Sequence, residues 1–93
     1  MKAAAEFAIC YDISNDAERA RVDRFLKGFG FRVQKSVFEC RLTRSGKVAV
    51  VDGLRRMDLR SGSVKIYRIY GGSASVVVGQ PMANPDAGFA FSL

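Results

Sequence analysis

The sequence predicts a single α+β domain with the element order βαββαβ. Two observations predict it: residues 5–11, 31–42 and 61–71 are strand-like runs, and two stretches of helical periodicity separate these runs. The chain has 93 residues, the size of one domain. Hydrophobic residues make up 48% of it, which is enough to form a real core and argues against disorder.

The first predicted strand, residues 5–11, is apolar on both of its alternating faces. Phe7 and Ile9 share one face, and Ala8 and Cys10 share the other. A strand that is apolar on both faces is typical of the centre of a sheet, covered on both sides.

The first predicted helix follows directly. Asn15 with Glu18 three residues later resembles a capping box, in which the two side chains and backbone amides bond reciprocally. Glycines at 28 and 30 predict its end. Its apolar stripe, with helical spacing, consists of Val22, Phe25, Leu26 and Phe29.

The middle of the chain, residues 31–42, is either one long bent strand or two short strands that turn near Lys35. A second helix begins at Thr43 or Ser45. Residues 61–71 form a strong strand between glycines. The buried stripe expected for the second helix is Val48, Val51, Leu54 and Met57.

With two strands in the middle, this order is the ferredoxin-like arrangement, in which both helices cover one face of the sheet. We expect residues 1–72 to form that domain and residues 73–93 to add a C-terminal strand and tail. Tyr67 and Ile69 make the second face of the last main strand apolar as well. The economical cover for that face is an identical sheet, so the sequence predicts a face-to-face homodimer, with the tail at the dimer or partner contacts.

Composition excludes several kinds of chemistry. The chain has no histidine, which excludes Ser-His-Asp and Cys-His catalysis and the HExxH zinc site. Its two cysteines, Cys10 and Cys40, cannot fill a four-ligand zinc site and are expected to be free thiols in a reducing cytosol. We also expect no signal peptide and no membrane partner, and therefore a soluble cytoplasmic protein.

The formal net charge of +6 makes phosphate-rich partners the default expectation. The basic side chains are either ordinary solvated charges or a surface that binds nucleic-acid backbones. Asp12, at the end of the first strand, either caps the following turn or binds a metal ion. The candidates for nucleic-acid binding are Arg19, Arg21, Arg24, Lys27, Arg32 and Lys35.

Four strings of residues stand out in combination: Tyr11-Asp12-Ile13-Ser14-Asn15-Asp16, Arg19-x-Arg21-Val22, Leu26-x-x-x-Gly30 and Arg32-Val33-Gln34-x-Ser36-Val37-Phe38-Glu39. The combination is specific, far beyond a lone motif. Through these strings, residues 5–70 resemble the CRISPR-associated Cas-two family. One departure is Lys35, where that family often has an aromatic residue.

This resemblance implies a homodimeric scaffold for DNA or RNA in CRISPR spacer acquisition, working with an integrase partner. It also implies a possible metal-dependent endonuclease activity, in which two Asp12 side chains share one Mg²⁺ per dimer. Tyr11, Ser36 and Phe38 match positions linked to that activity. The alternative is a non-catalytic ferredoxin-like domain that binds nucleic acid or regulates another protein.

Overall fold

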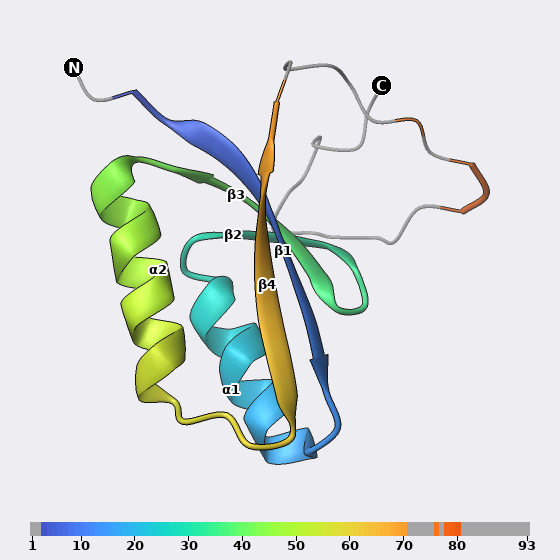
Figure 1. Ribbon diagram of the computed structural model, residues 1–93. Coiled ribbons are helices and arrows are strands. Elements are labelled where there is room, and N and C mark those ends of the chain that lie inside the picture. Colours follow the sequence, from blue (N-terminus) through green and yellow to red (C-terminus); the bar gives the residue numbers. More distant parts are fainter. Residues whose placement is uncertain (1–2, 71–75, 77, 81–93) are drawn as a thin grey trace.

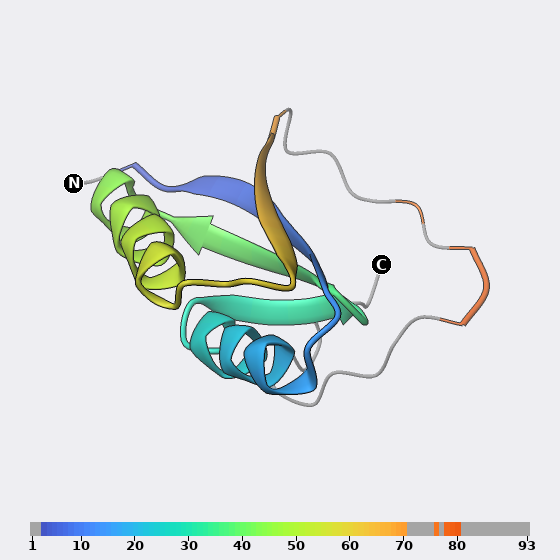
Figure 2. The same cartoon turned by 60° about the horizontal axis from the view of Figure 1, so that its bottom comes forward.

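The computed structural model describes residues 3–70, 76 and 78–80. Two helices lie on the same side of a four-stranded sheet (Figures 1 and 2). The sheet order is β2-β3-β1-β4, and every neighbouring pair is antiparallel. This is the ferredoxin-like βαββαβ fold that the sequence predicts. Its elements are β1 (Ala5–Ile13), α1 (Asp16–Leu26), β2 (Gly30–Gln34), β3 (Val37–Leu42), α2 (Arg44–Arg56) and β4 (Gly62–Ile69).

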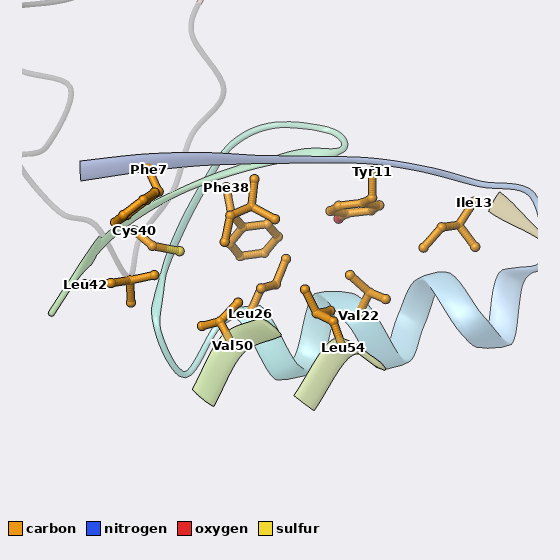
Figure 3. Close-up of a cluster of buried hydrophobic side chains, with 11 residues drawn as sticks. Phe7, Tyr11, Ile13, Val22, Leu26, Phe38, Cys40, Leu42, Val50 and Leu54 are labelled. Atoms are coloured by element: carbon orange, nitrogen blue, oxygen red, sulfur yellow. The ribbon is translucent and has the colours of Figure 1, made fainter. Parts of the chain in front are cut away.

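The central position of β1 is confirmed, since it pairs with β3 on one side and β4 on the other. Phe7, Ile9 and Tyr11 are buried and point towards the helices, as Figure 3 shows for Phe7 and Tyr11. Ala8 and Cys10 lie on the opposite face and are half-buried. The described structure therefore has one covered sheet face and one open face.

The middle segment is two strands, with the turn at Lys35 and Ser36. Gly30 starts β2 directly opposite Cys40 of β3. A Cβ at Gly30 would lie 2.1 Å from the carbonyl oxygen of Glu39, so only glycine allows β2 to approach β3 this closely.

The buried stripe of α2 differs from the expected one. Val50 is fully buried and Leu54 nearly so, whereas Val48 is 53% exposed. The prediction for Val48 is wrong because the helix presents the side of Val50 to the sheet. Gly53 marks where the helices touch, since a Cβ there would lie 2.2 Å from the Phe25 ring.

The predicted C-terminal strand falls in residues 73–93, of which only 76 and 78–80 are described; no strand is assigned to those four, and the remainder lies outside the described residues. The structure holds one chain, so the dimer stays a prediction. Within the described ranges, neither helix is long and apolar enough to cross a membrane. Both cysteines are free thiols, as expected.

Candidate nucleic-acid and metal site at the end of the first strand

Asp12 lies near the end of β1 on the open face of the sheet, where its side chain is exposed. The register places it opposite Ser63 of β4, with Lys65 diagonally beyond on the same face. The backbone N–H of Tyr11 donates to the carbonyl of Ser36 at 3.0 Å, which brings the β2–β3 turn to the same end of the sheet. Asp12, Ser36 and Ser63 are thus brought together, and Asp12 projects towards solvent.

The interpretation of Asp12 as a turn cap is wrong. Within residues 3–70, no hydrogen bond to its carboxylate is formed. The helix cap is Asn15, whose side chain accepts the Glu18 N–H at 2.9 Å. The Asp12 carboxylate therefore remains available to a ligand.

The capping box is only half formed. The Glu18 carboxylate does not accept a hydrogen bond from the backbone N–H of Asn15. It accepts hydrogen bonds from the backbone N–H groups of Arg60 and Ser61 and from the Ser61 hydroxyl, the last at 2.6 Å. The Asn15 N–H donates instead to the Ser61 hydroxyl at 3.0 Å. The Ser61 hydroxyl, followed by the two backbone N–H groups, holds the pKa of Glu18 below its usual range. Glu18 is nearly buried and fixes the loop that leads into β4.

Strand β4 also approaches β1 very closely at this end. A Cβ on Gly62 would lie 1.8 Å from the carbonyl oxygen of Asp12. The backbone N–H of Ser14 donates to the Ser61 carbonyl at 3.2 Å. These contacts fix the backbone around Asp12 although its side chain is exposed.

Tyr11 and Phe38 are both in the core, 4% and 0% exposed. Their rings are 6.3 Å apart and tilted, and both are labelled in Figure 3. The Tyr11 hydroxyl donates to Asp23 of α1, and Arg32 of β2 donates to the same carboxylate at 2.6 Å. Burial, then the bond to Asp23, raises the pKa of Tyr11 well above its ordinary value. In this arrangement both rings hold the end of β1 against the helix and do not face solvent.

The six predicted nucleic-acid-binding residues fall into two groups. Arg32 is engaged with Asp23 and lies over the Phe38 ring, 5.7 Å from its centroid. Arg19 donates to the Ile13 carbonyl at 2.8 Å and pairs with Asp16. Both hold α1 to the sheet. The other four are exposed and form no ion pair within the described residues: Arg21, Arg24, Lys27 and Lys35.

The carboxylate oxygens of Asp12 are ligands of the type that Mg²⁺ prefers, but one copy of the chain supplies few of them. Mg²⁺ prefers oxygen ligands and usually takes one or two carboxylates together with water and substrate phosphates. Among the described residues, no three acidic or cysteine side chains gather into a metal-binding group. One copy of the chain offers one carboxylate, so a firmer site needs a second copy.

Sequence reasoning missed Asp23 and the long-range role of Glu18. Asp23 sits among basic residues on the first helix, and nothing local distinguishes it from a solvated charge. Its partners on β1 and β2 are 12 and 9 residues away along the chain. The capping motif singles out Glu18, but the partners of its carboxylate are 42 and 43 residues away.

Comparisons with known proteins all match the same family. The model of the family described as CRISPR associated protein Cas2 matches residues 6–75. A protein of Mycobacterium tuberculosis named CRISPR-associated endoribonuclease Cas2 is 36% identical over 72 residues, which cover 77% of this chain and 64% of that protein. A Thermodesulfovibrio yellowstonii protein named CRISPR-associated endoribonuclease Cas2 2 is 38% identical over 81 residues, covering 86% and 89%. The chain thus spans slightly less than two thirds of the mycobacterial relative.

Solved structures agree with the sequence matches. A hypothetical protein from Thermus thermophilus aligns with a TM-score of 0.77 at 31% identity, covering 87% of this chain and 98% of the other. A crystal structure described as cas2 aligns with a TM-score of 0.74 at 30% identity, covering 85% and 91%. The family model matches well over half of the chain, and relatives above 30% identity cover more than two thirds of it. This chain therefore belongs to the Cas2 family of CRISPR-associated proteins.

Proposed function

We propose that the protein is a homodimeric scaffold that binds the backbones of nucleic acids during CRISPR spacer acquisition, together with an integrase partner. The observation that carries this proposal is the set of exposed basic side chains described above, which form no ion pair within the described residues. Unpaired Lys and Arg side chains bind phosphates and release counterions, which gives affinity with little sequence preference.

The open sheet face supports a homodimer. Tyr67 is 52% exposed on it, and Phe31, Val37 and Ile69 are only half-buried there. Apolar side chains exposed on a sheet face are stabilised when a second sheet covers them. A second copy would bring a second Asp12 to the same assembly, and with it a second carboxylate.

A second candidate function, phosphodiester cleavage, is favoured by the exposed Asp12 carboxylate, which accepts no hydrogen bond within the described residues. Two Asp12 side chains, one from each copy, would hold one Mg²⁺. When bound, Mg²⁺ neutralises charge on the phosphate and lowers the pKa of water. Lys65, diagonal to Asp12, would hold a flanking phosphate. The relatives' names, endoribonuclease and endonuclease, agree with this class of reaction.

Salt-dependent binding tests the scaffold. For duplex DNA, we expect the logarithm of the association constant to fall linearly with the logarithm of salt concentration, with a slope of about −0.9 for each phosphate contacted. Arg21→Gln with Arg24→Gln is expected to make that slope shallower. The matched control is Arg55→Gln with Arg56→Gln, an equal charge change at the end of α2. Affinity that does not change between low and high salt would contradict the scaffold.

Cleavage is tested separately with Asp12→Asn. We expect Mg²⁺-dependent cleavage of RNA or DNA to disappear, while sedimentation shows that the oligomeric state is kept. The matched control is Glu6→Gln, which changes another exposed carboxylate on the same strand and face. Cleavage that survives Asp12→Asn assigns the activity to another site or to a contaminant.

A further inference from the structure

An open cavity of about 410 Å³ lies at the other end of β1, away from Asp12. It is lined by residues from the start of β1, the first turn of α2 and the end of β4, three segments that lie in the upper half of Figure 1. Phe7 lines it from β1, Arg44 and Lys47 from α2, and Arg68 and Tyr70 from β4 and its end. None of the described residues that line it is acidic.

The cavity concentrates positive charge. The Lys47 ammonium lies 5.4 Å from the centroid of the Phe7 ring, and the Arg68 guanidinium carbon lies 5.8 Å from the same centroid. Arg44 is a third exposed cation in the lining. Within the described residues, none of the three forms an ion pair. Three positive charges that share one cavity repel each other, and a bound anion would offset this repulsion.

The sequence at the start of α2 adds to the positive potential of the cavity. The first turn of a helix favours acidic side chains because the backbone N–H groups give it a partial positive charge. Here the first turn contains no acidic residue, and Arg44 and Lys47 occupy positions near it. This arrangement stabilises a bound anion more than it stabilises the free helix.

The aromatic groups indicate the kind of anion. Tyr70 is 74% exposed, and the Arg68 guanidinium lies over its ring at 4.8 Å. An arginine fork binds phosphate with two parallel hydrogen bonds, and an exposed aromatic ring next to it offers a flat surface to a base or sugar. An acidic protein segment would use the charges but would gain less from the ring.

We propose that this cavity binds a backbone phosphate of the nucleic acid, at a second position remote from Asp12. The inference rests on the proposed nucleic-acid-binding function and adds Arg44, Lys47 and Arg68 to the residues that perform it. Each chain would then bind the polynucleotide at both ends of β1.

Equilibrium binding to duplex DNA across a salt series tests the inference. We expect Lys47→Gln to make the slope of log association constant against log salt shallower by about 0.9 for each phosphate that the variant no longer neutralises. Affinity would fall roughly five- to tenfold at 0.1 M salt on the same relation. Arg56→Gln, an equal charge change on the same helix outside the cavity, is the control and should keep the wild-type slope. Circular dichroism establishes that both variants are folded.

The outcomes separate the two proposals. If the wild-type protein shows no salt-dependent binding, the scaffold function itself is wrong. If the wild-type protein binds but Lys47→Gln behaves like Arg56→Gln, the scaffold stands and the cavity inference is overturned. Amide signals of Arg44 and Lys47 should also shift when inorganic phosphate is added to the labelled full chain. If polyglutamate shifts these signals and duplex DNA does not, the occupant is an acidic protein segment and the inference is overturned.

Discussion

The Tyr11 hydroxyl connects the central strand to the first helix, and Tyr11→Phe removes this connection while the ring keeps its packing. The hydrogen bond that disappears goes to a charged acceptor, Asp23, and such bonds contribute about 1.5–3 kcal/mol. Asp23 keeps its bond from Arg32, so we expect a loss at the lower end, about 1.5–2 kcal/mol of unfolding free energy at neutral pH.

The pH dependence makes this prediction sharper. Burial followed by the Asp23 hydrogen bond raises the pKa of Tyr11, so the folded state keeps the proton when the unfolded state loses it. An unfolded tyrosine titrates near pH 10. Above that pH the folded protein binds more protons than the unfolded chain, and its stability falls by up to about 1.4 kcal/mol per pH unit from this group. The Phe variant lacks this loss, so the stability difference between wild type and variant should narrow as pH rises above about 10.

Urea unfolding measures both effects when wild type and variant are compared at equal protein concentration, because the stability of the proposed dimer would depend on concentration. The matched control is Tyr70→Phe, since Tyr70 is exposed and its hydroxyl makes no hydrogen bond within the described residues. We expect that control to match wild type at every pH. A Tyr11→Phe difference that stays constant through alkaline pH, or that is absent at neutral pH, would refute the reasoning.

Three further predictions concern packing and charge. Gly53→Ala is expected to lower stability, because overpacking against Phe25 costs about 1–3 kcal/mol and exceeds the helix-propensity gain of up to about 1. The control is Gly46→Ala in the same helix, whose added Cβ would meet no atom closer than 3.4 Å and should not lower stability. Urea unfolding measures the stability of both variants. Equal effects of the two substitutions would contradict the steric argument. Glu18→Gln should destabilise the protein at neutral pH. Folding lowers the pKa of Glu18, so the stability that its carboxylate contributes is fully present above the unfolded pKa of about 4.3 and is lost as pH falls through the folded pKa. The difference in unfolding free energy between wild type and Glu18→Gln should therefore shrink in acid. A difference that stays constant with pH would refute this prediction. Burial, then the charge of Glu39, raises the pKa of Cys40 to about 11, so iodoacetamide should modify Cys40 in the folded protein far more slowly than in urea; equal rates would contradict its burial.

The spacing of apolar residues was enough to predict the two helices, the strands of residues 5–11 and 61–71, and the central place of β1. It left open whether residues 31–42 form one strand or two. It failed for Val48, because Val48 and Val50 are equally apolar and only the rotation of α2 against the sheet decides which is buried. Such rotation depends on packing between the helices, at Gly53. Local patterns do not contain that information.

The candidate site was predictable only in part, again because local sequence patterns do not identify contacts between distant elements. The end of an apolar strand indicated where Asp12 lies, and its exposure agrees with a ligand-binding role. Net charge did not show that Arg19 and Arg32 are engaged within the fold, because their partners are a backbone carbonyl and a carboxylate on other elements. Basic residues in a sequence are therefore candidates for phosphate binding only after their internal partners are known.

The sheet order has a consequence for synthesis of the chain. Strand β1 leaves the ribosome first, yet its two neighbours are residues 37–42 and 62–69. Pairings between residues so far apart form slowly, because a long loop must close before the strands can pair. Until β4 has emerged, one edge of this apolar strand has no partner and is open to pairing with another nascent chain. The four described strands can be fully paired only after Ile69, at the end of β4, has been added.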